Sequence, residues 1–304
     1  MNYLLERFRN FILFLVIFSI VIILSLADYS GNIKVLRIGA IPDQNQEVLH
    51  RRFNLLSEKI SNQLDVEVKY IPVTSYTAAV SGFKANDLDL VWFGGLSGVQ
   101  ARLQTPDSLV IAQRDIDKKF KSVFIVNKKH NLRQIKNIED LKKLKNLRFT
   151  FGSENSTSGR LMPQYFLNLA GISIKDFKGN KAGFSGSHDA TITYVNSGTY
   201  DAGVLNKPIW DKNYQLNNER TENVDIFWIT PEYVDYHWLA QGDLDQKFGE
   251  GFTKSLKDLI IDLDINNPTD REILDLFNAK EFIEANAKQY EIIESIARKL
   301  NKIR

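Results

Sequence analysis

After residue 34, short apolar runs typical of strands alternate with segments whose apolar residues have the spacing of a helix. Residues 35–40 and 88–93 are short, nearly continuous apolar runs that predict buried strands, whereas residues 47–64 carry apolar side chains at a helical spacing. Further strands are predicted at 66–73, 123–126, 149–151 and 202–205, with helices at 75–85, near 138–145, at 158–170 and at 189–197. Such alternation predicts an α/β protein with mostly parallel, covered sheets.

The pattern changes after about residue 240. Residues 243–262, 269–276 and 285–303 have helical spacing and predict helices packed onto a finished sheet. No linker rich in Pro, Gly or Ser marks a domain boundary, although 304 residues suffice for two cores. We therefore expect two lobes, with the chain crossing between them near 120–126 and again near 226–238.

The first 27 residues resemble a signal peptide. Arg7 and Arg9 precede an apolar run of 16 residues, 11–26, which is shorter than the roughly 20 residues that span a bilayer. Ser25 and Ala27 are the small residues that a signal peptidase reads, so cleavage after Ala27 and export to the periplasm are predicted. An uncleaved membrane anchor is the alternative.

Composition excludes several classes of function. Lys and Arg number 39 against 37 Asp and Glu, a balance that does not suit binding to nucleic acid. The chain has no Cys, which excludes thiol catalysis and disulfides, and no two of its four His have metal-ligand spacing. We therefore expect no cofactor, no metal and no catalysis.

One segment is suited to binding an anion. The predicted strand 149–151 leads into a turn with three consecutive hydroxyls, Ser156, Thr157 and Ser158, ahead of a predicted helix. Main-chain N–H groups at a helix start, together with rotatable hydroxyls, can hold an oxyanion without Lys or Arg. Pro163 predicts a kink or a restart of this helix near Met162. A capped helix without a ligand is the alternative.

Six short blocks carry a resemblance to a known family. They are residues 41–45, 72–76, 89–95, 156–159, 186–190 and 201–203. In this order they resemble the periplasmic substrate-binding proteins of phosphonate and phosphite ABC importers, including a branch described as selenate binders. The resemblance covers essentially all of the chain after the signal peptide.

The resemblance implies the two-lobed type II periplasmic-binding-protein fold with a double-strand hinge, closing on its ligand. Lobe one would comprise 35–122 and 230–304, including the C-terminal helices, and lobe two 123–229. The implied function is capture of a small oxyanion and its delivery to an ABC permease with its ATPase. We expect the binding protein to be a monomer.

The resemblance also implies a set of ligand-binding residues. Tyr76 would close the site from lobe one, the strand end at Trp92 and Phe93 would form a wall, and His188 would complete the shell. The full predicted set is Tyr76, Trp92, Phe93, Ser156, Thr157, Ser158, His188, Asp235 and Tyr236. Trp92 and Phe93 could instead be core aromatics, and Asp235 a solvated carboxylate. Asp43 and Asp189 are interpreted as a turn residue and a helix cap, respectively.

Asp235 bears on the choice of anion. An ionised carboxylate only accepts hydrogen bonds, so it favours an anion that carries an acidic O–H, such as phosphite or an alkylphosphonate, over sulfate or selenate. The crowded aromatic residues favour a small ligand. A selenate receptor remains an alternative, as does an exported phosphoester or phosphonate hydrolase that uses His188 beside the hydroxyl-rich turn.

Overall fold

The computed structural model describes Ile12, Ser19 and residues 34–216 and 218–303. The chain divides into two compact units, Met1–Val35 and Leu36–Arg304, and the fold given below is that of the second. The predicted signal peptide lies outside the described residues except for Ile12 and Ser19. Among the described residues, no helix combines the length and apolarity needed to cross a membrane.

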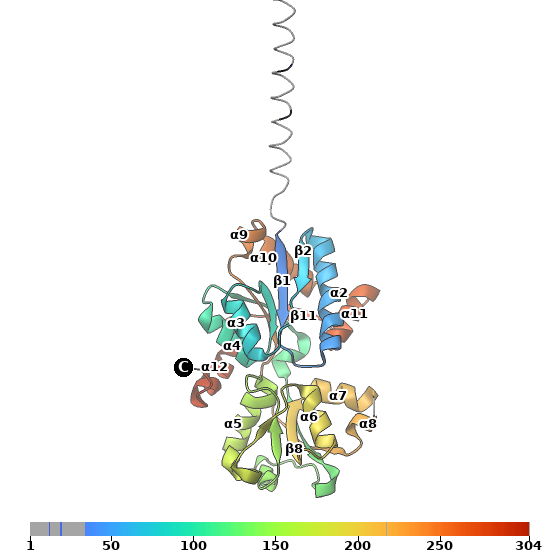
Figure 1. Cartoon of the computed structure of the whole chain (residues 1–304), viewed down its shortest axis with the longest axis vertical. Helices are drawn as coiled ribbons and strands as arrows, with labels where there is room; N and C mark the ends of the chain where they lie inside the picture. Colours follow the sequence, from blue (N-terminus) through green and yellow to red (C-terminus); the bar gives the residue numbers. More distant parts are fainter. Residues whose placement is uncertain (1–11, 13–18, 20–33, 217, 304) are drawn as a thin grey trace, which may run out of the picture. The chain divides into compact units, whose positions relative to one another are not determined.

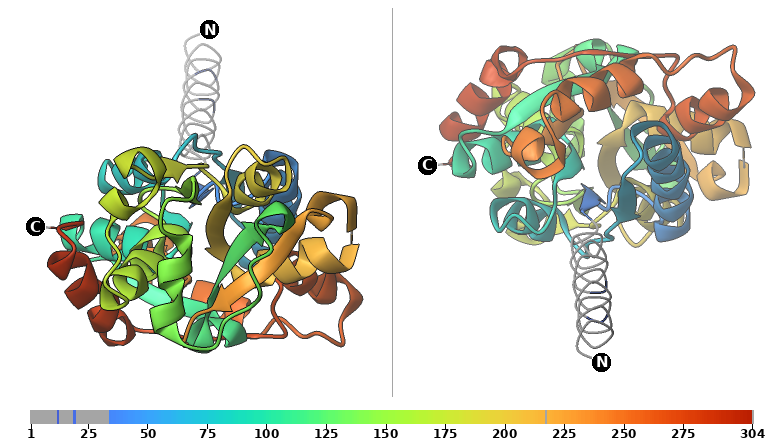
Figure 2. Two further views of the ribbon diagram at one scale, coloured as in Figure 1. Left: turned by 90° about the horizontal axis from the view of Figure 1, so that it is seen from below. Right: turned by 90° about the horizontal axis from the view of Figure 1, so that it is seen from above.

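Lobe one is built on a six-stranded sheet with the strand order β11-β4-β10-β3-β1-β2 (Figure 1). Its strands are β1 (Val35–Ala40), β2 (Glu67–Tyr70), β3 (Leu90–Phe93), β4 (Leu109–Arg114), β10 (His237–Ala240) and β11 (Phe282–Glu284). Its helices are α2 (Gln46–Leu64), α3 (Tyr76–Lys84), α4 (Gly95–Gln104), α9 (Leu244–Phe248), α10 (Phe252–Ile261), α11 (Pro268–Phe277) and α12 (Glu291–Lys299). Helices α3 and α4 lie on one side of the sheet and α2 and α11 on the other, while α12 packs beside α4 (Figures 1 and 2).

Lobe two is built on a five-stranded sheet with the order β7-β6-β8-β5-β9. Its strands are β5 (Ser122–Asn127), β6 (Phe149–Phe151), β7 (Gly183–Phe184), β8 (Ala202–Asn206) and β9 (Val224–Ile229). Its α-helices are α5 (Met162–Leu169), α6 (His188–Asn196), α7 (Lys207–Leu216) and α8 (Asn218–Thr221). Short 3-10 segments in the two lobes are Asp115–Lys119, Lys128–His130, Ile138–Leu144, Ile174–Asp176, Lys178–Asn180 and Ala287–Tyr290.

The prediction of mostly parallel sheets is wrong, because both sheets are mixed. Strand β10 runs antiparallel to β3 and β4, and β5 runs antiparallel to β8 and β9, whereas β1–β3 and β6–β8 are parallel pairs. Strands β5 and β10 are the first strands after each passage between the lobes. They therefore run away from the junction, while β1, β3 and β6 run towards it and deliver their loops to it.

Two crossing segments join the lobes, and their main chains form hydrogen bonds with each other. The N–H of Phe120 donates to the carbonyl of Tyr233 at 2.8 Å, and the N–H of Tyr233 donates back at 3.0 Å. A second rung joins Asp235 N–H to the carbonyl of Asp117 at 3.0 Å. This pairing is the double-strand hinge of the predicted α/β fold.

Two helices differ from a simple continuous helix. The turn after Ser156 is a π-helical segment, Thr157–Leu161, and α5 then begins with Pro163 in its first turn, as the predicted restart near Met162 requires. The single helix predicted at 243–262 is wrong, because Gly249 and Gly251 have φ of 121° and 82° and separate α9 from α10.

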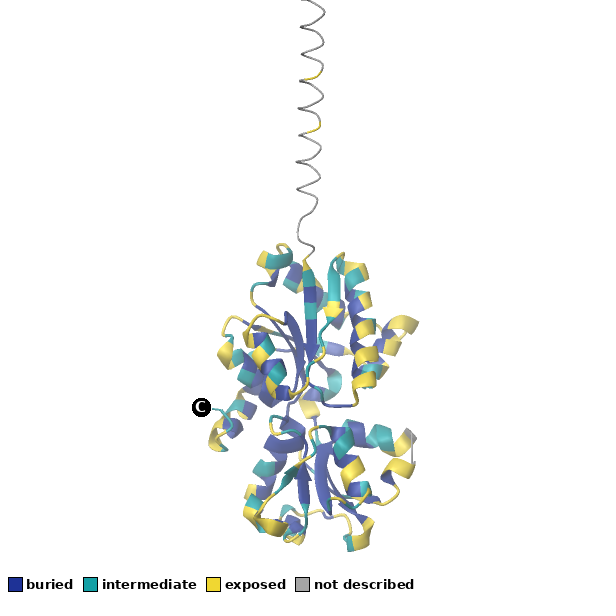
Figure 3. Cartoon of the chain, viewed as in Figure 1, coloured by how far each residue is buried: buried dark blue, intermediate teal, exposed yellow. Residues whose placement is uncertain are grey.

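The cores of both lobes are centred on strands β3, β5 and β8, which are buried along their length (Figure 3). In lobe one an aromatic cluster surrounds Trp92, whose ring contacts those of Trp238, Phe277 and Phe282 with centroid separations of 5.2–6.0 Å. This packing fixes the end of β3 and the segment before β10, both of which reach the junction between the lobes.

Candidate functional site

Seven of the predicted residues gather, buried, where the two lobes meet. None of them is more than 2% exposed, and they come from α3, from the turn after β6, from α6 and from the second crossing segment. They are Tyr76, Ser156, Thr157, Ser158, His188, Asp235 and Tyr236. Several of their polar atoms have no hydrogen-bond partner within the protein. Because an unpaired buried polar atom is costly, the arrangement is suited to a small polar ligand.

The three hydroxyls of the turn differ in their hydrogen bonds: two have partners within the protein and one has none. Ser156 is the N-cap, and its Oγ accepts the N–H of Gly159 at 2.9 Å. The Oγ1 of Thr157 accepts the N–H of Leu96 from α4 of lobe one at 2.9 Å. The Oγ of Ser158 is buried and unpartnered, so its hydroxyl is available to a ligand.

One carboxylate oxygen of Asp235 accepts a hydrogen bond within the protein, and the other does not. Its Oδ1 accepts the N–H of Gly95 at the start of α4 at 2.9 Å, whereas Oδ2 is buried without a partner. Burial raises the pKa of Asp235 to about 7, although the N–H of Gly95 and the hydroxyls of Thr157 and Ser158 oppose the rise. The carboxyl can therefore hold or release a proton near neutral pH.

Tyr76 is the first residue of α3, after the N-cap Ser75, whose Oγ accepts the N–H of Ala78 at 3.0 Å. Its hydroxyl is buried and unpartnered. Burial, with a contribution from Asp43, raises the pKa of Tyr76 well above its usual value, and the nearby Ser156 hydroxyl opposes this rise. Tyr76 is therefore a neutral O–H donor at physiological pH.

His188 and Tyr236 belong to one hydrogen-bond chain. The N–H of Asn206 donates to Nδ1 of His188 at 3.3 Å, and Nε2 lies 3.3 Å from the hydroxyl of Tyr236. Burial lowers the pKa of His188 to about 4, so the ring is neutral and its proton is on Nε2. Since Nδ2 of Asn206 also donates to the Tyr236 hydroxyl at 3.1 Å, that hydroxyl keeps its own proton for donation.

Trp92 and Phe93 point to opposite faces of β3. The Trp92 ring stacks on Tyr236 at 5.6 Å between centroids, and the Phe93 ring meets Phe83 edge-on at 5.8 Å. Both are fully buried core aromatics. Trp92 thus supports Tyr236 from behind, while Phe93 packs between β3 and α3.

Other polar residues near the junction were not predicted as site residues. Asp43 is 2% exposed, its Oδ1 has no partner, and burial raises its pKa despite the charge of Arg52. Arg114 holds Asp117 through two hydrogen bonds of 2.7 and 2.8 Å and lies 4.8 Å from the centroid of the Tyr236 ring. Asp43 occurs in one of the six family blocks, whereas neither arginine has a local sequence signal.

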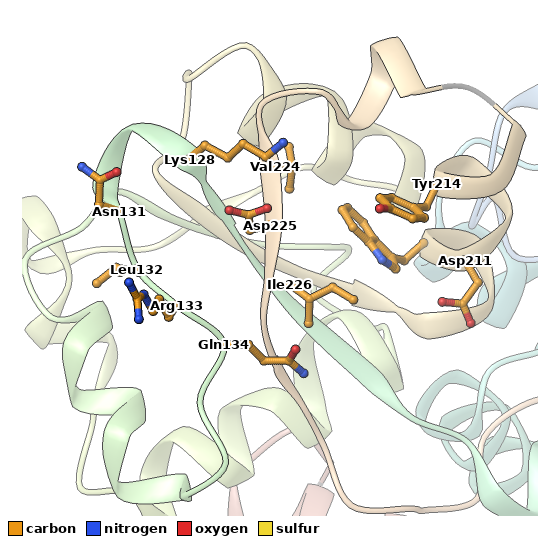
Figure 4. A pocket seen from close by; sticks show the side chains of 11 residues that line it. Lys128, Asn131, Leu132, Arg133, Gln134, Asp211, Tyr214, Val224, Asp225 and Ile226 are labelled. Atoms are coloured by element: carbon orange, nitrogen blue, oxygen red, sulfur yellow. The ribbon is translucent and has the colours of Figure 1, made fainter.

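A pocket on lobe two is separate from this site. A pocket of about 920 Å³ is lined by residues of α7, β9 and the 128–134 segment, among them Lys128, Asp211 and Tyr214 (Figure 4). It contains no predicted site residue, and two of its charged groups already have partners: Nζ of Lys128 donates to the main-chain carbonyl of Glu222, and Asp211 accepts from Lys207. Among the described residues, no group of three or more His, Asp or Glu is arranged to hold a metal ion.

Comparison with known proteins identifies the family. A family model described as "ABC transporter, phosphonate, periplasmic substrate-binding protein" matches residues 38–290. The chain belongs to this family. It is 71% identical, over 90% of its length and 92% of the relative's, to the "Probable ABC transporter phosphite binding protein PhnD1" of Prochlorococcus marinus (strain MIT 9301). It is 28% identical, over 85% of its length and 74% of the relative's, to the "Phosphonates-binding periplasmic protein" of Escherichia coli K12.

Solved structures agree with the fold of the phosphonate-binding family. A structure of the Prochlorococcus PhnD1 in complex with methylphosphonate superposes with a TM-score of 0.89 at 71% identity, covering 90% of this chain and all of that one. A binding-protein component of an ABC phosphonate transporter from Pseudomonas aeruginosa has a TM-score of 0.75 at 20% identity, covering 87% and 86% of the two chains. The predicted two-lobed periplasmic-binding-protein fold is thereby confirmed.

Membership of the phosphonate-binding family makes the protein the substrate-binding component of an ABC importer and not an enzyme. The hydrolase alternative is therefore wrong. The site agrees with this conclusion, since neither ring nitrogen of His188 bonds to a serine of the turn. Without that contact the turn lacks an activated nucleophile.

Proposed function

We propose that the protein captures phosphite or a small alkylphosphonate between its lobes, in the periplasm, and delivers it to the permease and ATPase of an ABC importer. The 71% identical relative is named as a phosphite-binding protein, and its structure was solved with methylphosphonate. We further propose that residues 1–27 are a cleaved signal peptide, that the moving lobes comprise 35–122 with 230–304 and 123–229, and that the protein is a monomer.

The predicted site residues have different roles in this proposal. Tyr76, Ser158 and Tyr236 have hydroxyl protons to offer to the oxygens of the anion, and Oδ2 of Asp235 is an acceptor. Ser156 shapes the turn, and His188 fixes the Tyr236 hydroxyl. The ring of Trp92 stacks on Tyr236 and supports it, and the ring of Phe93 packs against Phe83 of α3. Thr157 is considered in the next subsection.

Oδ2 of Asp235 carries the proposal that the ligand is a protonated phosphorus oxyanion. A buried, unpartnered carboxylate oxygen beside a bound anion is favourable only when a proton lies between them. Phosphate monoesters have a second pKa of about 6, and phosphorus oxyanions of this type can bring that proton at neutral pH. Sulfate and selenate cannot, so we place them below phosphite and methylphosphonate in affinity.

The absence of any Lys or Arg among the nine predicted residues agrees with a ligand of low charge. Arg114 contributes only indirectly, because its guanidinium is paired with Asp117 and lies behind the rings of Tyr236 and Trp92. A singly charged anion held by neutral donors needs no direct cation.

A ligand panel tests the proposal. Isothermal titration and thermal shift would be measured at pH 7 with phosphite, methylphosphonate, phosphate, 2-aminoethylphosphonate, sulfate and selenate. We expect the tightest binding and the largest stabilisation for phosphite or methylphosphonate. Binding of selenate or sulfate as tightly as the phosphorus oxyanions would overturn the ligand assignment.

A further inference from the structure

The start of α4 in lobe one receives its polar caps from two distant segments. Its N-cap residue, Gly94, has no side chain to cap the helix. Instead, the N–H of Gly95 donates to Oδ1 of Asp235 and the N–H of Leu96 donates to Oγ1 of Thr157, each at 2.9 Å. Two of the first N–H groups of α4 are thus satisfied, one of them by a residue of lobe two.

The glycines at this position leave room for Thr157. A Cβ added to Gly94 would lie 3.3 Å from Oγ1 of Thr157, and one added to Gly95 would lie 3.4 Å from the same atom. A side chain at Gly94 would also meet Oδ1 of Asp235 at 3.3 Å. The close approach of lobe two to the start of α4 is therefore accommodated by the sequence Gly94-Gly95.

The hydroxyl oxygen of Thr157 already forms a hydrogen bond with lobe one. It accepts the N–H of Leu96 and lies close enough to Asp235 to lower the pKa of that carboxyl. Thr157 is 1% exposed, so water does not compete for this hydrogen bond in the structure. By contrast, the neighbouring Ser158 hydroxyl has no partner.

We propose that Thr157 is a positioning residue that latches the two lobes, while Ser158 is the hydroxyl of the turn that binds the ligand. This inference rests on the proposed function, because the latch acts on the closed, ligand-binding form. The Thr157–Leu96 hydrogen bond joins the lobes, so it forms on closure and stabilises the closed form relative to the open one. A ligand shifts the population towards that form, and the latch increases the share that is closed.

The substitution Thr157→Val removes the latch. Val in place of Thr157 keeps the shape of the side chain but leaves the N–H of Leu96 buried and unpaired in the closed form. In the open form water satisfies that N–H, so only closure becomes less favourable. We expect the Kd for methylphosphonate to rise about 10- to 100-fold, mainly through faster dissociation.

The test compares Thr157→Val, Thr157→Ser and Ser158→Ala. Methylphosphonate affinity and dissociation rate would be measured by titration and stopped-flow fluorescence, and lobe closure at saturation by small-angle X-ray scattering. We expect Thr157→Val to stay partly open at saturation, Thr157→Ser to close and bind nearly as the wild type, and Ser158→Ala to bind weakly but close fully. Equal unfolding temperatures establish that each variant is folded.

Thr77→Val is the matched control. It removes another hydrogen bond between the lobes, from Nδ2 of Asn155 to Oγ1 of Thr77 at 2.9 Å, but that contact is exposed and water can replace it. We expect its Kd to change by less than about threefold. The latch is refuted if Thr157→Val closes as fully as the wild type at saturation, or if it behaves as Ser158→Ala does.

Failure of the proposed function gives a different result. In that case the wild type would bind none of the phosphorus oxyanions. The latch is then tested on the ligand-free protein with spin labels on the two lobes, where Thr157→Val must lower the closed fraction. An unchanged fraction would overturn the latch independently of the ligand.

Discussion

The N–H of Gly95 donates a hydrogen bond of 2.9 Å to Oδ1 of Asp235. This contact holds the carboxyl group in one orientation at the start of α4. The other oxygen, Oδ2, is buried and unpartnered. A carboxyl with one fixed and one uncommitted oxygen, and with a pKa raised by burial to about 7, is suited to share a proton with an oxyanion. Two predictions follow from this geometry.

The first prediction concerns ligand choice. Asp235→Asn places an amide N–H₂ or C=O where the carboxylate oxygen lies, and the amide no longer repels a fully ionised anion. At pH 8 we expect affinity for methylphosphonate to fall by about 10- to 100-fold and affinity for sulfate and selenate to rise. Titration of both classes of ligand into wild type and variant measures the change. Parallel losses for all anions would contradict the selectivity role of Asp235.

The second prediction concerns pH. In the free protein Asp235 holds its proton below about pH 7 and loses it above, whereas the complex retains one proton between the carboxyl and the ligand. Affinity for phosphite should therefore be greatest between about pH 6 and 7. It should fall at lower pH, where Asp235 and the ligand are both protonated and binding must release one proton, and at higher pH by up to about tenfold per pH unit from each group that must regain a proton.

Calorimetry in two buffers of different ionisation enthalpy measures the proton uptake directly. We expect uptake to increase between pH 6.5 and 8.5, and Asp235→Asn to show a shallower decline that reflects the ligand's own ionisation. An affinity that is constant from pH 6 to 9 would exclude a shared proton.

The sequence predicted the central strands of this fold better than its edges. Strands β3 and β5 are fully buried and β1 is buried except at Val35 and Arg37, so all three are nearly continuous apolar runs. Strand β7 has two residues and β11 has three, too few to show a period. Helix α4 was missed because it begins Gly94-Gly95 rather than with a capping side chain, and its caps come from residues 61 and 140 positions away.

For the site, local signals sufficed for the turn but not for the contacts between lobes. Consecutive hydroxyls before a helix are visible in the sequence, so Ser156–Ser158 could be predicted. The division of labour among them depends on Leu96 of the other lobe, which no local pattern places there. Likewise Asp189 was interpreted as a cap, but the N-cap of α6 is Ser187, and Asp189 instead accepts the N–H of Asn45 across the junction at 2.9 Å.

The third prediction concerns acid stability of lobe two. Burial would raise the pKa of Asp201, but hydrogen bonds from Arg148, His130 and Lys129 hold it well below its usual range. Its carboxylate receives both Nε and Nη2 of Arg148, at 3.0 and 2.7 Å, and thereby ties β6 to β8. Because the pKa is lowered in the folded state, this stabilisation is present above about pH 4 and is lost as the pH falls further.

Asp201→Asn should accordingly lower the midpoint of thermal unfolding at pH 7 by roughly 2–5 °C. The difference from the wild type should shrink below pH 4, where the wild-type carboxylate also becomes protonated. Asp225→Asn, an exposed change on the edge strand β9 of the same sheet, is the control and should have little effect at either pH. An equal difference at pH 7 and pH 3 would show that the ionised carboxylate is not the stabilising group.

The last prediction concerns the packing that supports the Asp235–Tyr236 segment. A Cβ added to Gly98 on α4 would lie 2.2 Å from Nε2 of His237, and that ring is buried against Tyr290 with 4.1 Å between centroids. The ring is 1% exposed, so Gly98→Ala must displace the buried ring, β10 or α4. We expect a loss of about 1–3 kcal/mol in the free energy of unfolding, with weaker ligand binding because Asp235 and Tyr236 directly precede His237. Chemical denaturation and titration measure both effects.

The variant His237→Ala leaves space for the new methyl group, so Gly98→Ala should cost much less in that background. If the two losses simply add, the clash with His237 is not the cause.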